Sequence, residues 1–201
     1  MMRFLIISVF ALIGLNSCKP FHLEGQQSTS IQDTVYNNYF SDYQQETLYR
    51  GRIDVYGKVI TGLFVAKRIN EDEHRMVFTS DFGNTLFDFT IKPGAFQVNY
   101  IMDELDKKFI VNILKKDFTT LVQIANPVNR RVDKGTVWGF ESVFEQKYFL
   151  VDKENGQLNK IVIFSKYKPK VDFEFIRDKS NQLSAIEIVH HNIKLQIKLS
   201  I

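Results

Sequence analysis

The sequence lacks most of the residues on which covalent or metal chemistry depends. It contains one cysteine among 201 residues, so an internal disulfide is excluded and a metal–thiolate centre has nothing to build on. Of its four histidines, the adjacent pair His190 and His191 would point to opposite faces of a strand and could not hold one ion together. No glycine-rich phosphate loop, Gly-x-Ser-x-Gly or His-Glu-x-x-His motif occurs. We therefore expect no enzyme activity, no metal site and no cofactor.

The chain also has little excess charge and little proline. Its 26 basic residues nearly balance 23 acidic residues, giving a net charge of +3, and no run of Lys and Arg stands out. This balance argues against a nucleic-acid-binding surface. Eighteen Phe stand against one Trp and four Pro, and 44% of the residues are hydrophobic. The composition suits one β-rich domain with a sizeable core.

The first eighteen residues are set apart from that domain. Arg3 precedes an apolar run, Phe4–Leu15, which is long enough for the core of a signal peptide and too short to span a bilayer. The run ends in Leu15-Asn16-Ser17-Cys18, which resembles the lipobox of bacterial lipoproteins. The resemblance implies that residues 1–17 are a lipoprotein signal peptide and that Cys18 is the lipidated first residue of the mature protein. The alternative is an ordinary signal peptide followed by an incidental cysteine.

Residues 18–30 are polar and rich in Gln, Ser and Gly, which predicts a flexible tether between the lipid and the domain. Two acyl chains suffice for stable membrane attachment. Glu24 is the one acidic residue near Cys18. We therefore expect an anchor in the outer membrane, with the domain facing the periplasm.

Residues 31–201 are predicted to form one domain that is mainly β. An apolar stripe with helical spacing, opened by Ser30, predicts a helix from Ile31 to Tyr43. From residue 47 the period changes to two, which is typical of strands. Eleven strands are expected, at 49–55, 59–69, 75–79, 85–91, 95–101, 136–143, 147–151, 158–164, 170–177, 183–189 and 193–200.

A helical interruption separates the first five strands from the rest. Leu105 begins an apolar stripe that runs to Leu114, with Asp103 as its cap, and Asp117 then caps a second short helix that ends at Asn126-Pro127. We interpret this segment as a helical hairpin laid across one face of the sheet, which brings the expected helices to three.

One turn carries an unexpected side chain. Strands Arg75–Thr79 and Thr85–Ile91 flank a turn of Ser, Asp, Gly and Asn in which Phe82 is the single apolar residue. The backbone of such a turn stays near water, so the ring cannot easily reach the core. Phe82 either folds back over a neighbouring strand or enters an apolar environment outside the protein.

The segment Thr79–Gly94 resembles the region around the protruding loop of LolB, the outer-membrane lipoprotein that receives other lipoproteins and inserts them. In that family an exposed apolar residue is followed by Gly, a small polar pair, an alternating strand and a Pro-Gly turn. Phe82 and Gly83 occupy the positions of the membrane-inserting residue and its glycine. The Gly51-Arg52-Ile53 segment and the closing hairpin, Leu183–Leu199, are also similar to the family.

The resemblance implies an eleven-stranded, incompletely closed antiparallel barrel whose concave face is covered by helices that enclose an apolar cavity. Such a cavity takes the acyl chains of a client lipoprotein, delivered by a periplasmic LolA-like carrier, for insertion into the outer membrane. LolA lacks a lipid anchor, so Cys18 favours the membrane-bound receptor. The residues expected to bind acyl chains are Phe87, Phe89, Ile91, Leu105, Phe109, Ile113, Phe118 and Leu121. The alternative for each is an ordinary place in the core.

The lid differs from that of the family. The family usually carries a Pro-Leu element and a Trp-containing helix there, whereas Lys115–Asn126 has neither and the chain's one Trp is Trp138. This difference leaves the ligand open and motivates a second hypothesis, a structural or assembly lipoprotein that uses the same fold to bind a protein in an envelope complex. A continuous apolar cavity beneath the lid would favour transfer, and solid packing would favour the second role. A monomer is expected in either case.

Overall fold

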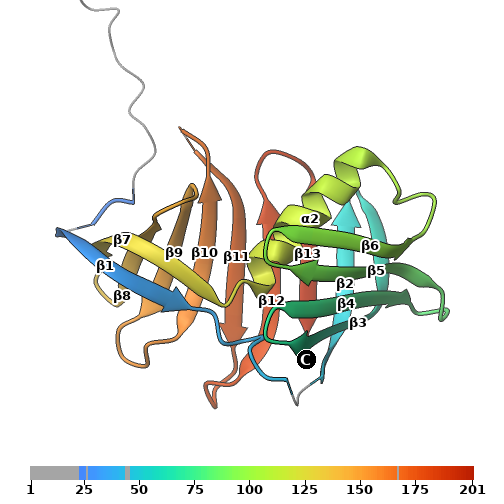
Figure 1. Ribbon diagram of the computed structural model, residues 1–201, viewed down its shortest axis with the longest axis horizontal. Coiled ribbons are helices and arrows are strands. Elements are labelled where there is room, and N and C mark those ends of the chain that lie inside the picture. The colour runs from blue at the N-terminus through green and yellow to red at the C-terminus, as the bar shows by residue number, and fades with distance from the viewer. Residues whose placement is uncertain (1–22, 26, 44–45, 167) are drawn as a thin grey trace, which may run out of the picture.

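The alternating segments pair into one curved antiparallel sheet, and a single helix lies across it (Figure 1). The computed structural model describes residues 23–25, 27–43, 46–166 and 168–201. Its elements are β1 (Ser28–Tyr36), β2 (Glu46–Val55), β3 (Lys58–Asn70), β4 (Glu73–Ser80), β5 (Thr85–Lys92), β6 (Ala95–Ile101), α2 (Lys108–Val122), β7 (Ala125–Asp133), β8 (Val137–Ser142), β9 (Lys147–Asp152), β10 (Leu158–Phe164), β11 (Pro169–Arg177), β12 (Leu183–His190) and β13 (Leu195–Ser200).

The strands follow the order β1-β7-β8-β9-β10-β11-β12-β13-β2-β3-β4-β5-β6. All strand pairs are antiparallel, and the pairing of the last strand, β13, with β2 joins the two halves of the sheet, with Leu195 opposite Val55. The edge strands β1 and β6 do not pair with each other, so the sheet stays open. The prediction of a mainly β, antiparallel and incompletely closed sheet is thereby confirmed.

The predicted count of eleven strands is wrong, because the sheet has thirteen. The two additional strands, β1 and β7, pair with each other. β1 occupies much of the segment for which the spacing of Ile31 and Val35 predicted a helix, and that helix is absent. An edge strand accepts polar residues because one of its sides faces water. β7 was not predicted, because Pro127 lies near its start and Asn126-Pro127 was interpreted as the end of a helix rather than as part of a strand.

The predicted three helices are also wrong, since the described residues form one, α2. The two short helices expected between Asp103 and Asn126 are one continuous helix of fifteen residues, and Asp117 lies inside it rather than at a cap. The exposed pair Lys115-Lys116 does not break the helix, because it faces away from the buried side chains of Leu114 and Phe118. α2 begins at Lys108 without a side-chain cap.

The main core lies between α2 and the sheet. The buried ring of Phe118 packs on three strand residues, with centroids 5.5 Å from Phe64, 5.5 Å from Phe87 and 6.2 Å from Phe89. Phe87 and Phe89 are stacked at 4.6 Å. These four side chains expose at most 1% of their surface. The helix therefore seals an aromatic row that the open sheet could not cover by itself.

A second, smaller cluster lies on the other face of the sheet. Tyr148 belongs to it while its neighbour Phe149 belongs to the main core, and adjacent strand residues point to opposite faces. Leu23 is buried in this second cluster, so the last part of the predicted tether is packed on the domain. Among the described residues, every member of the two clusters lies between positions 23 and 199. The core is therefore complete without residues 1–18.

The two phenylalanines of α2 should differ sharply in what they contribute to stability. Phe118 has no exposed surface, and truncating such a ring leaves a cavity that costs about 3–5 kcal/mol. Phe109 is 58% exposed, and we expect Phe109→Ala to lower the free energy of unfolding by less than about 1 kcal/mol. Urea denaturation of Phe118→Ala and Phe109→Ala measures both values. Similar losses in the two variants would contradict the packing described for α2.

Candidate functional site

The predicted loop residue Phe82 lies at the tip of the β4–β5 hairpin with 94% of its surface exposed. The ring therefore does not fold back over a neighbouring strand, which was one of the two interpretations of the sequence. Gly83 follows with a φ of +86°, a conformation that glycine adopts without strain. Backbone hydrogen bonds close the turn, from Ser80 N to Asn84 O at 2.8 Å and from Gly83 N to Ser80 O at 2.9 Å.

Asp81, the residue before Phe82, fixes the turn to β2 and β3. The carboxylate of Asp81 accepts a hydrogen bond of 2.5 Å from the Thr61 hydroxyl of β3 and forms an ion pair of 3.2 Å with Arg50 of β2. The backbone N–H of Asp81 also donates to Thr61 O. The exposed ring of Phe82 is thus held on an anchored turn, although the ring itself does not contribute to the packing of the domain.

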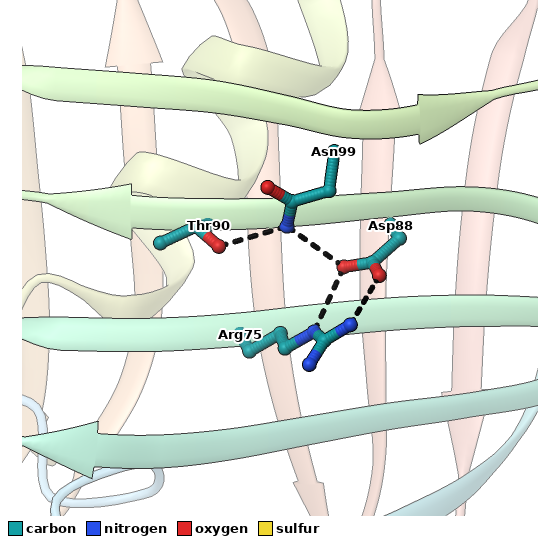
Figure 2. Close-up of polar contacts among 4 residues, drawn as sticks. All are labelled: Arg75, Asp88, Thr90 and Asn99. Carbon is teal, nitrogen blue, oxygen red and sulfur yellow. Dashed lines mark hydrogen bonds and ion pairs between the residues drawn. The ribbon is translucent and has the colours of Figure 1, made fainter.

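A polar network on β4, β5 and β6 holds the strands that carry this hairpin and lead into α2 (Figure 2). Asp88 accepts two hydrogen bonds from the Arg75 guanidinium, at 3.0 and 2.6 Å, and one of 3.0 Å from Asn99. Asn99 also donates to the Thr90 hydroxyl at 2.8 Å. The hydrogen bonds from Arg75 hold the pKa of Asp88 below its usual range, with Asn99 adding to the effect. The network secures edge strand β6 and offers no unpaired acid or base.

Most of the residues predicted to bind acyl chains pack against one another in the core. Phe87, Phe89, Phe118 and Leu121 have no exposed surface, and Ile91 exposes 3%. Leu105 is partly buried against the same core. The structure brings these six side chains together as packed core beneath α2, in the place where an enclosed cavity was expected. Their predicted contact with a ligand stays untested.

An open groove of about 770 Å³ lies beside α2, between the helix and the ends of β9, β10, β11 and β12. Of the predicted acyl-chain residues it is lined by Phe109 and Ile113. Its apolar lining is Phe109, Ile113, Ile163, Phe164, Val171 and Ile193, and its lysines are Lys115, Lys116, Lys147 and Lys170. Lys147 is buried and forms an ion pair with Glu145. The groove is amphipathic and falls in the size range of ligand pockets, about 300–1,000 Å³.

A buried polar pair in the wall of the groove ties α2 to the sheet. His190 Nε2, at the end of β12, lies 2.8 Å from Asp117 Oδ2, and the two side chains expose 5% and 2% of their surface. Burial raises the pKa of Asp117, and the partner His190 offsets part of that effect. Sequence reasoning missed this pair because it took Asp117 for a cap. The available signal was the spacing of Ile113, Asp117 and Leu121, which places a carboxylate on the apolar face of a helix.

The remaining predictions concern the lipidation site at Cys18, metal binding and membrane-spanning segments. Cys18 and residues 1–17 lie outside the described residues, so the lipidation prediction is untested. In the part of the chain that the structure describes, no group of three or more His, Cys, Asp or Glu side chains could hold a metal ion. None of the described residues belongs to a helix with the length and apolarity of a membrane span.

The Asp117–His190 pair predicts a change of stability with pH. Because burial raises the pKa of Asp117 above its unfolded value, the folded protein holds this proton more tightly than the unfolded chain. The resulting stability is complete below an unfolded pKa of about 3.9 and is lost as pH rises through the folded pKa. Asp117→Asn keeps a hydrogen-bonding group and cannot ionise. Its stability relative to the wild type should therefore increase as pH rises from about 3.5 towards 7.

Urea denaturation of the wild type and Asp117→Asn across that range measures the difference. Asp117→Leu serves as the comparison, because it leaves His190 without this partner and should cost about 1–3 kcal/mol. A wild type that is clearly more stable than Asp117→Asn at pH 7 would show that the ion pair outweighs the burial of the carboxylate.

Comparison with known proteins gives distant structural neighbours. No family model and no curated protein matches the chain. A DUF1329 family protein from Desulfovibrio piger ATCC 29098 is 8% identical, covering 78% of this chain and 83% of its own, with a TM-score of 0.41. A domain assigned to outer membrane lipoprotein sorting, from Vibrio parahaemolyticus, is 6% identical, covering 77% of this chain and 81% of its own, with the same TM-score. Similarity at this level carries no argument about function.

Proposed function

We propose that this protein is a lipid-anchored receptor of the outer membrane that accepts acylated client lipoproteins from a periplasmic LolA-like carrier and inserts them into the membrane. It acts as a monomer, without a cofactor and without covalent chemistry. The observation that carries the proposal is Phe82, a large apolar ring that is 94% exposed on an anchored turn. The lipobox-like sequence at Cys18 and the resemblance of Thr79–Gly94 to the LolB loop support it.

The energetics assign Phe82 a local role. Moving one Phe side chain from water into an apolar environment gains about 1.5–3 kcal/mol. Acyl chains gain about 0.8 kcal/mol for each buried CH₂, so a lipid on Cys18 would dominate attachment. Phe82 is therefore proposed to enter the lipid surface during hand-over, where it offers the client's acyl chains an apolar route into the bilayer.

The groove beside α2 is the proposed place for the client's acyl chain. Phe109 and Ile113 supply apolar surface there, and the ring of Phe109 is exposed and therefore open to contact with an acyl chain. Phe87, Phe89 and Phe118 would meet an acyl chain only if α2 moved away from the sheet, because their present contacts are with one another.

The solid packing beneath α2 favours a second candidate function, that of a structural or assembly lipoprotein which binds a protein partner. The two functions differ in what the purified domain retains. Mass spectrometry of protein isolated from membranes should find bound lipid if the groove carries acyl chains, and Phe109→Ala should reduce its amount. Protein that is free of lipid, and unaffected by Phe109→Ala, would favour the assembly role.

The lipid anchor gives a direct prediction. Cys18→Ala removes the only acyl acceptor that the lipobox-like segment offers, so the variant should accumulate uncleaved or in soluble form. Membrane fractionation and the mass of the mature protein measure both outcomes. A correctly cleaved Cys18→Ala protein that still fractionates with the outer membrane would refute the lipoprotein assignment.

The hand-over role of Phe82 predicts a separation of function. Phe82→Glu should fold with near-wild-type stability, because the ring makes no packing contribution, and should still take up a lipidated client. It should fail to insert that client, because a carboxylate is expensive within a bilayer. Phe82→Leu is the matched control and should stay active. Melting temperature, client uptake and client insertion are measured for both variants. Normal insertion by Phe82→Glu would refute the hand-over role of Phe82.

A further inference from the structure

The groove beside α2 carries more positive than negative side chains, and they come from both of its walls. Two lysines of α2 and two lysines of the sheet line it: Lys115, Lys116, Lys147 and Lys170. Its acidic lining residues are Asp117 and Glu145. An anionic group bound in the groove would therefore meet basic side chains from the helix on one side and from the sheet on the other.

Both acidic residues of the groove already have a partner. Asp117 is paired with His190, and Glu145 is paired with Lys147. Within the part of the chain that the structure describes, the other three lysines form no ion pair: Lys115, Lys116 and Lys170. The residues outside that part include neither Asp nor Glu. Three ammonium groups of one groove are thus left available to an anion.

The fourth lysine is buried in the wall of the groove. Lys147 exposes 5% of its surface, whereas the side chain of its partner Glu145 is about half exposed. An ammonium group has three N–H donors, and burial of a charge is costly unless the charge is paired and hydrogen-bonded. A further anionic oxygen in the groove would complete the set of acceptors around Lys147.

The apolar and basic positions of α2 follow one another along the groove. Phe109, Ile113 and Lys116 are spaced by four and three residues, so they lie on one side of the helix. Seven residues separate Phe109 from Lys116, which corresponds to about 10 Å along the helix axis. On the sheet side the groove likewise has an apolar residue, Ile193, and a basic residue, Lys170. The lining therefore suits a ligand with an apolar chain and an anionic group at one end of it.

We propose that the groove holds a membrane phospholipid when no client is bound, with an acyl chain against Phe109 and Ile113 and the phosphate between Lys116 and Lys170. Lysine is a common ligand of phosphate, and its charge strengthens the hydrogen bonds that it donates. The neutral polar side chains that line the groove include Asn112 on α2 and Asn192 on the sheet side. Donors spread over two walls suit the oxygens of a phosphate, which point in several directions, better than the two oxygens of a carboxylate.

This inference rests on the function proposed above in placing an acyl chain in the groove, and it adds the head group. A phospholipid and the acyl chain of a client would compete for Phe109 and Ile113. Receipt of a client would therefore displace the phospholipid, which returns to the bilayer. Lys116 and Lys170 would select the resident lipid by its phosphate, whereas the client would be held by its chain.

The test is isothermal titration calorimetry of residues 19–201 with three probes that share one acyl chain and are kept below their micelle concentrations. The probes are dodecyl phosphate, dodecanoate and the uncharged dodecyl maltoside. Dodecyl phosphate should bind at least about tenfold more tightly than dodecyl maltoside, because it alone of these two gains charged hydrogen bonds. Inorganic phosphate should show no measurable binding, because it lacks the chain.

Two kinds of variant separate the head group from the chain. Lys116→Gln with Lys170→Gln should weaken dodecyl phosphate by about tenfold or more and leave dodecyl maltoside within about twofold. Lys134→Gln with Lys179→Gln is the matched control, since it removes the same charge at exposed positions outside the groove. Phe109→Ala should weaken all three dodecyl probes.

Equal affinities for dodecyl phosphate and dodecyl maltoside, or equal losses in the two lysine pairs, would overturn the phospholipid site. Tighter binding of dodecanoate than of dodecyl phosphate would also overturn it and would indicate a fatty acid. Uptake of an acylated client by the same protein would leave the receptor function intact in either case. Phosphate-selective binding by a protein that takes up no acylated client would sustain the phospholipid site and reject the receptor function.

Discussion

The packing of Phe118 against Phe64, Phe87 and Phe89 is the contact on which the rest of the structure depends. An open sheet with two unpaired edges exposes both faces, and its aromatic row would meet water without a cover. α2 provides that cover, and it runs diagonally across the sheet from the end of β6, at the right of the view, to the start of β7 near the middle (Figure 1). One helix therefore completes the core and connects the two edge regions of the sheet.

The same helix lines the groove, so the position of α2 links stability with any ligand contact. Its inward side chains belong to the core, while Phe109 and Ile113 border the groove and Asp117 reaches His190 at the end of β12. Lifting α2 would expose several buried rings, each worth about 1.5–3 kcal/mol, and would leave the buried Asp117–His190 pair in water. Ligands that use the groove as it stands avoid this cost.

The strands were predictable to the extent that their burial follows a period of two. β2, β3, β4, β11 and β13 alternate in this way. β5 is buried at six consecutive positions, and it was located instead as a run of β-forming residues between turn signals. β1 and β7 are polar and satisfy their backbone groups by pairing with each other across about 90 positions, a relation that no local pattern reveals. The exposure of Phe82 could be anticipated because polar turn residues surround it. The Asp117–His190 contact could not, since its partners are 73 positions apart and each has a plausible local explanation.

In the lipid-anchored receptor that we propose, the burial of Leu23 would limit how far the domain can move from a lipid on Cys18. Leu23 is held in the second core cluster with Tyr148, near the start of β9, and Phe164, at the end of β10. Five Cα–Cα steps separate Cys18 from Leu23, and a fully extended chain spans at most about 3.6 Å per residue, so the leash is no longer than about 18 Å. A folded carrier of about 100 residues or more would be wider than that distance, because its radius of gyration alone is about 13 Å. Any exchange of clients would thus take place against the bilayer surface, with the approach of the carrier confined to the sides of the domain that the membrane leaves open.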